Sequence, residues 1–338
     1  MRIAIVNDLA LAVTSIRRVL EHEGRHTVAW VARDGEAALA RFVADEPDLV
    51  LMDLVMPVLD GVQTTKRMRE LSKCPILLVT ADVGRSSGLI FEAMGHGALD
   101  VVNLPVLTEP PAESGRDLLR KIATIERLLG RSGSVPRPAA ADAAAAPLAR
   151  RRPPLIAIGS STGGPKTLAT VLAALPRQMA NAVVVVQHID AQFAPGLVSW
   201  LDGQIALTVR GAEVGMIPLA GTVSVAISND HLVIQADGRF AYQSEPLEEP
   251  YRPSVDVFFR SLVRHWRDPG VAVLLTGMGR DGGKGMLELR RAGWHTIAQD
   301  EASCAVYGMP KAAVELGGAS EVLPPEAIAR SLGQRLCR

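Results

Sequence analysis

The sequence predicts an α/β protein of two doubly wound parallel-sheet domains, with helices on both faces of each sheet. The first observation is length: 338 residues is a little over two domains at roughly 150 residues each. The second is that short apolar runs rich in β-branched residues alternate with helical patterns in both halves. The third is a segment between the halves that cannot bury a core. Continuous apolar strands separated by single helices indicate parallel sheets, because right-handed crossovers place helices on both faces.

Five buried strands are predicted in the first half, at 2–6, 27–31, 49–52, 75–80 and 99–102. A helix is expected between the first two, where four apolar residues share one face: Ala12, Ile16, Val19 and Leu20. A less regular apolar stripe follows the second strand, formed by Ala37, Ala40, Phe42 and Val43. These helical periods support a strand–helix alternation.

The segment 131–154 contains eight Ala, five Pro and five Arg against a single acidic residue. Its prolines interrupt any helix that the alanines favour, so it is predicted to be a semi-extended linker. The predicted organisation is therefore a first domain at 1–128, a linker at 129–153 and a second domain at 154–338.

The second domain resumes the pattern with apolar strands at 155–159, 182–187 and 271–277. The intervening stretch 204–256 has many turn residues and brief apolar runs such as 222–227, so shorter or antiparallel strands are expected there.

Composition excludes several classes of protein. Hydrophobic residues make up 48% of the chain, and 36 Lys and Arg balance 36 Asp and Glu. That is too apolar for a wholly disordered chain and lacks the basic excess of a protein that coats nucleic acid. No run approaches the ~18 apolar residues that span a bilayer, and the start resembles no secretion signal. A soluble, cytoplasmic protein with reduced, non-metal-binding cysteines is expected from three widely spaced Cys.

Polar residues follow the strands of the first half, at the edge where parallel sheets bind ligands. Asp8 follows the first strand, Asp53 closes the third and Thr80 closes the fourth. Taken singly, each Asp is equally well explained as a helix N-cap or turn residue. Together, two carboxylates converging on one edge suit Mg²⁺, and a carboxylate beside Mg²⁺ can attack phosphorus to form an acyl phosphate.

Residues 2–128, with the run LMDLVMPVLDG, resemble the receiver domain of two-component response regulators. The resemblance implies that Asp53 accepts a phosphoryl group and that Asp8, Asp53 and the Val55 carbonyl bind Mg²⁺. It also implies that Thr80 follows the phosphate. Two residues depart from the pattern. Asn7 stands where receivers usually have an acid, and Leu104 where they usually have a Lys, so a charge partner for the phosphoryl oxygens is missing.

The run LIAIGSSTGGPKT at 155–167 is predicted to be a strand, a glycine-rich turn and a helix start. A phosphate-binding loop is one interpretation, but Pro165 intrudes between the second glycine and Lys166 and removes a backbone donor. A purely structural connection is another, although it leaves the hydroxyls at the tip unexplained. The third is a nucleophile elbow that presents Ser161 at the top of the sheet.

An elbow needs a base and an orienting acid, and both follow other strands. His188 comes directly after the strand at 182–187, and Asp281 lies in the glycine-dense loop after 271–277. Singly, such residues are more often surface or turn residues. Three adjacent parallel strands would instead bring hydroxyl, imidazole and carboxylate to one edge, as acyl transfer requires, and loop N–H groups would meet an oxyanion. The chain order Ser, His, Asp differs from that of α/β-hydrolases.

Residues 154–337 resemble the chemotaxis protein-glutamate methylesterase (CheB) family in several ordered runs: IAIGSSTGG, VVVVQHI, YRPSVDVFF, LLTGMGRDGGKGM and IAQDEASCAVYGMP. The resemblance implies a flavodoxin-like receiver linked to a Rossmann-like methylesterase domain, with a Ser161–His188–Asp281 triad and an oxyanion donor at the Met278 peptide N–H. It implies phosphorylation-regulated hydrolysis of glutamate γ-methyl esters on methyl-accepting chemoreceptors, and receptor glutamine deamidation in some members.

The same resemblance implies partners and cofactors. A CheA-like histidine kinase would donate the phosphoryl group, and the receptor would be the substrate. Mg²⁺ would be bound by the receiver only, with no cofactor for ester chemistry, and neither nucleic acid nor membrane insertion is implied. The VND start and the ALDVVNLP segment look most like the branch serving chemosensory-type pathways of the Wsp type.

Three alternatives remain open. A receiver-regulated serine esterase acting on a different substrate differs only in what it binds. A non-catalytic receptor adaptor predicts loss of a triad residue, and all three are present. A DNA-binding response regulator predicts a small basic output domain, whereas this second half has nearly two hundred residues and no basic excess.

Overall fold

The computed structural model describes residues 1–81, 83–128 and 152–336, which form two compact units. The predicted linker at 129–153 lies almost wholly outside the described residues, so its limits stay a prediction.

The first unit is a five-stranded parallel sheet in the order β2-β1-β3-β4-β5. Its strands are β1 (Arg2–Val6), β2 (Thr27–Ala32), β3 (Leu49–Met52), β4 (Ile76–Thr80) and β5 (Asp100–Asn103). Its helices are α1 (Ala10–Glu23), α2 (Gly35–Ala44), α3 (Gly61–Leu71), α4 (Val83–Gly95), α5 (Pro111–Ser114) and α6 (Arg116–Leu128). All five predicted strands are confirmed to within two residues, and the order is that of a flavodoxin-like doubly wound sheet.

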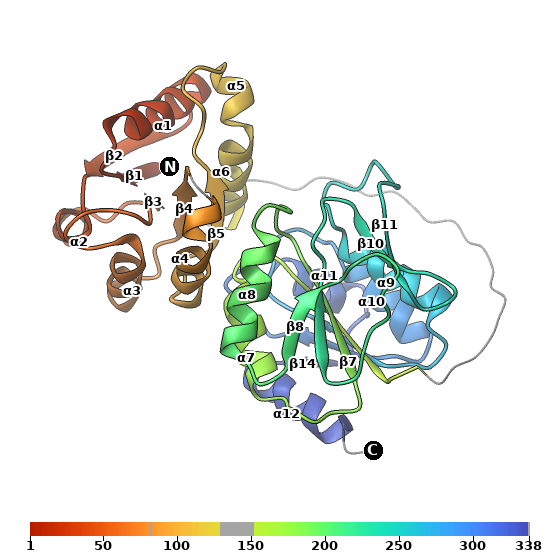
Figure 1. Ribbon diagram of the computed structural model, residues 1–338. Helices are drawn as coiled ribbons and strands as arrows, with labels where there is room; N and C mark the ends of the chain where they lie inside the picture. The colour runs from red at the N-terminus through yellow and green to blue at the C-terminus, as the bar shows by residue number, and fades with distance from the viewer. Residues whose placement is uncertain (82, 129–151, 337–338) are drawn as a thin grey trace. The chain divides into compact units, whose positions relative to one another are not determined.

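Helices cover both faces of this sheet, with α1, α5 and α6 on one side and α2, α3 and α4 on the other (Figure 1). The predicted inward face of α1 is confirmed, because Ala12, Ile16, Val19 and Leu20 are all buried. Of the predicted stripe on α2, Phe42 is confirmed as buried, whereas Ala37 is half-buried and Ala40 and Val43 are exposed. Asp34 caps this helix, and the resulting phase turns Gly35, Ala38 and Phe42 inward at intervals of three and four residues, leaving Val43 73% exposed.

The second unit is a seven-stranded, wholly parallel sheet in the order β14-β13-β12-β6-β7-β9-β8. Its strands are β6 (Leu155–Ser160), β7 (Ala182–Gln187), β8 (Thr208–Gly211), β9 (Thr222–Val225), β12 (Val271–Leu274), β13 (His295–Gln299) and β14 (Glu321–Leu323). Its helices are α7 (Gly164–Ala173), α8 (Ala194–Gln204), α9 (Val255–His265), α10 (Gly283–Arg291), α11 (Met309–Glu315) and α12 (Pro325–Leu336). Short strands expected within 204–256 are confirmed: besides β8 and β9, β10 (His231–Ile234) and β11 (Phe240–Gln243) form an antiparallel hairpin.

The helices of the second unit also divide between two faces, with α7, α8 and α12 on one and α9, α10 and α11 on the other. The main core lies under α9 and α10, where Phe258, Phe259 and Leu262 pack with strand residues and with Phe240 of the hairpin. This packing fixes the first turn of α9 beside the sheet edge that carries the candidate site.

Strands β12, β6 and β7 are neighbours, which is the arrangement that the predicted Ser161, His188 and Asp281 site requires. The sheet grows in opposite directions from β6, which places a topological switch point here. β12 ends at Leu274 instead of continuing to 277. The Leu275 N–H still donates to the Gly159 carbonyl of β6 at 2.9 Å, but the Thr276 N–H donates to the side-chain oxygen Gln299 Oε1 at 2.7 Å instead of to a strand carbonyl.

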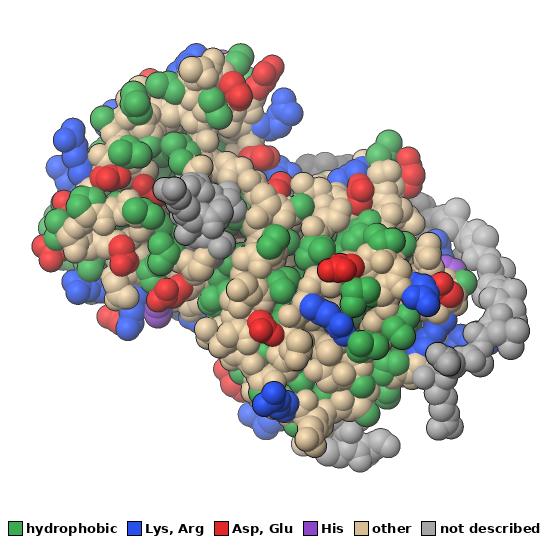
Figure 2. All heavy atoms as spheres, in the orientation of Figure 1, with side chains coloured by type: hydrophobic (Ala, Val, Ile, Leu, Met, Phe, Trp, Pro, Cys, Tyr) green, Lys and Arg blue, Asp and Glu red, His purple; other side chains and the backbone are tan. Residues whose placement is uncertain are grey.

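No helix in the described ranges is long and apolar enough to cross a membrane. On the face shown in Figure 2, basic and acidic side chains are interspersed over both units, without a continuous basic surface. That face gives no support to a nucleic-acid-binding role.

Candidate functional site

The two serines at the end of β6 have different surroundings. Ser160 is fully buried, and its hydroxyl donates to Gln187 Oε1 at 2.6 Å. Gln187 Nε2 in turn donates to the Ser161 carbonyl at 2.8 Å, so this amide ties the ends of β6 and β7 together. The Ser160 hydroxyl is therefore committed to a structural hydrogen bond, whereas Ser161 is the first residue beyond the strand.

The glycine-dense loop after β12 packs directly against Ser161. The Ser161 N–H donates to the Thr276 carbonyl at 3.0 Å. A Cβ built on Gly277 would lie 2.7 Å from the Ser161 Cβ, so only glycine allows this approach. Met278 follows immediately, and its peptide N–H donates to no residue in the described part of the chain. The loop thus brings an available backbone donor next to the predicted nucleophile.

The phosphate-loop interpretation receives no support from the side chains after the turn. Lys166 is exposed on α7, and the Thr167 hydroxyl donates to the Gly163 carbonyl at 3.2 Å. The Lys166 side chain thus faces solvent, and the Thr167 hydroxyl is used in a hydrogen bond at the start of its own helix.

His188 and Asp281 form a buried pair. His188 Nε2 lies 2.7 Å from Asp281 Oδ2, and the side chains are 8% and 3% exposed. His188 Nδ1 is buried without a hydrogen-bond partner in the described residues, and none joins it to the Ser161 hydroxyl. An unpartnered ring nitrogen at a site of this kind is suited to take up a proton, and catalytic hydrogen bonds often tighten only when substrate is bound.

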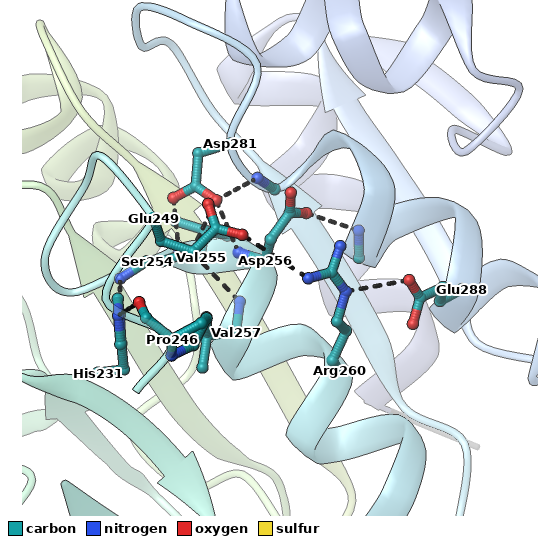
Figure 3. A network of polar contacts seen from close by, with 12 residues as sticks. His231, Pro246, Glu249, Ser254, Val255, Asp256, Val257, Arg260, Asp281 and Glu288 are labelled. Carbon is teal, nitrogen blue, oxygen red and sulfur yellow. Dashed lines mark hydrogen bonds and ion pairs between the residues drawn. The ribbon is translucent and has the colours of Figure 1, made fainter. Parts of the chain in front are cut away.

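Asp281 is surrounded by hydrogen-bond donors from the start of α9 (Figure 3). Oδ1 accepts from the Ser254 hydroxyl and the Asp256 and Gly282 N–H groups at 2.9, 2.9 and 3.0 Å. Oδ2 accepts from the Val255 N–H at 2.7 Å, besides facing His188. Burial alone would raise the pKa of Asp281, but the bond to His188 and these N–H groups outweigh it and hold the pKa below its usual value.

A second buried carboxylate, Asp256, lies in the first turn of α9. Its Oδ1 accepts the Gly285 N–H at 2.6 Å, so it caps α10 while Asp281 caps α9. Burial, with the charge of Asp281 added, raises the pKa of Asp256 to about 7. Arg260 lies on the same helix and pairs with Glu288 at 3.0 Å. The two helix N-termini are thus held together by carboxylates that differ in their ease of protonation.

Tyr251 covers one face of the imidazole. Its ring stacks on His188 with centroids 4.5 Å apart and planes 4° from parallel. A Cβ on Gly279 would lie 2.3 Å from the Tyr251 hydroxyl oxygen, so Tyr251 also contacts the loop that carries Met278. The stack limits access of water to His188 and presents a π face to the imidazolium that proton transfer creates.

Sequence reasoning assigned no role to Gln187, Tyr251 or Ser254. Tyr251 and Ser254 stand in the run YRPSVDVFF, which carries the family resemblance but predicts no role for its individual residues. That run was the available signal, since it joins an aromatic residue to a Ser that precedes a helix.

In the first unit, the predicted phosphoryl acceptor lies at the carboxyl edge of the sheet. Asp53 Oδ1 accepts the Leu54 N–H at 2.7 Å, and Oδ2 accepts from Asn7 Nδ2 at 3.0 Å. Asn7 Oδ1 is used locally by the Leu9 N–H at 2.9 Å. Burial raises the pKa of Asp53 to about 6, and the charge of Asp8 adds to the rise. The amide in place of an acid thus holds the acceptor carboxylate by a hydrogen bond.

The structure also explains the glycine at position 61 and locates the other residues predicted to act with Asp53. A Cβ on Gly61 would lie 1.9 Å from the Asp53 carbonyl oxygen, which accounts for the glycine in LMDLVMPVLDG. Val55 is 62% exposed, and Thr80 is buried at the end of the neighbouring β4. Leu104, where a Lys was expected, packs partly buried against the apolar core. Asp8 and Asp53 are brought together without a third acidic, His or Cys side chain in the described residues.

Comparison with known proteins agrees with both units. The CheB methylesterase family matches residues 156–332, and the response regulator receiver domain matches residues 3–109. Two relatives have the name protein-glutamate methylesterase/protein-glutamine glutaminase. One, from Cupriavidus metallidurans, is 52% identical over 333 residues, covering 98% of this chain and 97% of its own. The other, from Burkholderia thailandensis, is 53% identical over 334 residues, covering 98% and 96%.

A solved structure supports the second unit. The catalytic domain of Thermotoga maritima CheB methylesterase superimposes with a TM-score of 0.52 at 36% identity, covering 54% of this chain and 98% of that domain. Matches of this extent, together with the Ser161, His188 and Asp281 edge, lead to one conclusion: the chain belongs to the CheB methylesterase family and carries a response regulator receiver domain.

Proposed function

We propose that the protein is a phosphorylation-regulated protein-glutamate methylesterase. Its substrates are glutamate γ-methyl esters on methyl-accepting chemoreceptors, and the names of its relatives support glutamine deamidation as a second activity. The observation that carries the proposal is the buried His188–Asp281 pair, with an unpartnered His188 nitrogen at the strand end next to Ser161.

In the proposed reaction, Ser161 Oγ attacks the ester carbonyl carbon while His188 Nδ1 takes the hydroxyl proton. The Met278 N–H stabilises the oxyanion of the tetrahedral intermediate. Collapse breaks the bond to the methoxy oxygen, which leaves as methanol with the proton from His188. Water then attacks the γ-glutamyl–Ser161 ester with His188 as base, releasing glutamate and restoring Ser161. With glutamine the leaving group is ammonia.

Asp281 stays ionised through this cycle. Its Oδ2 keeps the proton of His188 on Nε2, so that Nδ1 presents a lone pair, and its charge stabilises the imidazolium. The hydrogen bond of His188 to Asp281 through Nε2 leaves Nδ1 as the base, which is the reverse of the more familiar serine protease arrangement.

The receiver is proposed to control this activity through phosphorylation of Asp53 by a CheA-like histidine kinase. Asp8, Asp53 and the Val55 carbonyl fit Mg²⁺, because two adjacent carboxylates repel each other unless a cation lies between them. When bound, Mg²⁺ neutralises charge on the transferring phosphoryl group. Asp53 supplies the attacking oxygen, Asn7 orients its carboxylate, and Thr80 is placed to follow the phosphate. The Wsp-type pathway and a cytoplasmic location belong to the same proposal.

The proposed function is tested with radiomethyl-labelled receptor in membranes. We expect the wild-type protein to release labelled methanol, and to release it faster after addition of a small phosphodonor. Hydrolysis of a small synthetic ester without methanol release from the receptor would instead favour a serine esterase with another substrate. Absence of any hydrolysis would favour a non-catalytic adaptor.

Phosphorylation of Asp53 is expected to require Mg²⁺. It is also expected to occur although Asn7 and Leu104 stand where receivers usually have an acid and a Lys. An in-line acyl phosphate depends more on nucleophile and cation than on the missing ammonium. Intact mass spectrometry after exposure to a phosphodonor should show one phosphoryl adduct. The adduct should not form when EDTA is present during the reaction, nor in the Asp53→Asn variant. An equal adduct in Asp53→Asn would contradict the assignment. Asp60→Asn, which alters only the cap of α3, is the matched control and should retain the adduct.

A further inference from the structure

Ser254 occupies an unusual place behind the candidate triad. Its hydroxyl lies 2.9 Å from Asp281 Oδ1, on the opposite oxygen from the one that faces His188. The low pKa of Asp281 keeps that carboxylate ionised, so it only accepts hydrogen bonds. The single hydroxyl proton of Ser254 is therefore donated to Asp281. The Ser254 oxygen also accepts the Val257 N–H at 3.3 Å as the N-cap of α9.

His231, on strand β10, holds the backbone of Ser254. The His231 ring is fully buried, and its Nδ1 accepts the Ser254 N–H at 3.1 Å. Its Nε2 lies 3.2 Å from the Pro246 carbonyl, which can only accept. Both contacts are satisfied only by the neutral ring with its proton on Nε2. Hydrogen bonds thus connect His231 to Ser254 and Ser254 to Asp281 (Figure 3), and a further one joins Asp281 to His188.

Capping alone does not account for this arrangement. An N-cap serine serves its helix by accepting an N–H of the first turn, and this role makes no use of the hydroxyl proton. Here that proton is fully buried and directed at Asp281. A bond to Oδ1 restricts rotation of the carboxylate about its Cβ–Cγ bond, and this sets where Oδ2 lies against His188 Nε2.

We propose that Ser254 and His231 are positioning residues for ester hydrolysis. Ser254 orients the Asp281 carboxylate, and His231 holds Ser254 in place from the β10–β11 hairpin. The inference rests on the proposed function for its kinetic consequence, whereas its structural part concerns the His188–Asp281 hydrogen bond itself.

The test compares Ser254→Ala and Ser254→Thr with Ser261→Ala in the full-length protein. Ser261 is a matched control: it is buried on the same helix, accepts the Ile234 N–H of β10 at 3.0 Å, and donates to the Phe258 carbonyl at 2.7 Å. We expect Ser254→Ala to lower kcat for methanol release about tenfold with little change in KM, as loss of a hydrogen bond to a charged group implies. Ser254→Thr keeps hydroxyl and cap and should restore most of kcat. Ser261→Ala should lower thermal stability and leave kcat unchanged.

A second readout needs no substrate. In protein labelled with ¹⁵N-histidine, the proton between His188 Nε2 and Asp281 gives a resonance that is assigned by its absence from His188→Gln. It should shift in Ser254→Ala and remain in place in Ser261→Ala. Wild-type kcat and an unmoved resonance in Ser254→Ala would overturn the proposal, as would equal changes in Ser261→Ala. If the wild type releases no methanol from receptor, the proposed function fails, and the resonance alone decides the positioning role.

Discussion

Replacing Ser161 with alanine is expected to lower methanol release by about four to six orders of magnitude. The nucleophile and base act as a unit, so loss of either leaves only what the oxyanion donors and substrate binding supply. Thermal stability should change little, because the Ser161 hydroxyl, unlike that of Ser160, makes no hydrogen bond to another residue in the described ranges. The measurement is kcat for release of labelled methanol, together with the unfolding midpoint.

Ser160→Ala is the matched control for this variant. Ser160→Ala removes the Ser160 hydroxyl and leaves the buried Gln187 Oε1 without its hydrogen-bond donor. We expect the loss to lower the free energy of unfolding by about 1–3 kcal/mol. Folded Ser160→Ala should therefore remain an active esterase with reduced stability. The reverse result, with Ser160→Ala inactive and Ser161→Ala at the wild-type rate, would show that the assignment of the elbow is wrong.

The Asp281→Asn variant is expected to lose about 10⁴-fold in kcat, comparable to the loss of the triad aspartate in serine proteases. Both carboxylate oxygens accept N–H donors here, Oδ1 from Asp256 and Oδ2 from Val255. Whichever way the amide is turned, its NH₂ group faces another N–H. The variant should thus be less stable as well as unable to hold the His188 proton on Nε2.

The Asp256→Asn variant tests whether kcat depends on the orientation of the Asp281 carboxylate or only on buried negative charge near the site. Asp256 is a carboxylate in the first turn of α9, which Asp281 caps, and its side chain accepts the Gly285 N–H, which an amide oxygen can also do. Because the pKa of Asp256 is raised to about 7, this group is partly neutral near pH 7 before any substitution. We expect kcat within about threefold of wild type, measured at pH 7 alongside Asp281→Asn. An equally large loss in both variants would mean that buried negative charge, and not the geometry of Asp281, limits the reaction.

Local patterns were sufficient to predict most of the fold. Buried parallel strands are continuous apolar runs, so β1, β3, β6 and β7 could be located from sequence to within a residue. The buried face of helix α2 could not be predicted in the same way. Its inward face depends on where the Asp34 cap starts the helix, and small residues such as Gly35 and Ala38 carry little hydrophobic signal.

The residues of the candidate site could be predicted from sequence, whereas the contacts among them could not. Ser161, His188 and Asp281 were predicted because the residues and loops that follow parallel strands lie at the binding edge of the sheet, whatever the distant contacts are. The choice of nitrogen on His188 could not be predicted, since it depends on which ring atom meets Asp281 in space. The role of Leu104 likewise required the core against which it packs.

The sequence by itself determined the two α/β domains, most of their strands and the polar residue types that follow those strands, because these follow from periodicity and from residues adjacent in the chain. Tertiary structure alone decided which of those ends are neighbours, through the order β12-β6-β7. It also decided that Tyr251 stacks on His188, and that Ser254 and His231 support Asp281. Such contacts join residues 23 to 63 positions apart, and hydrogen bonds and ring stacking depend on distances and angles that a linear pattern does not encode.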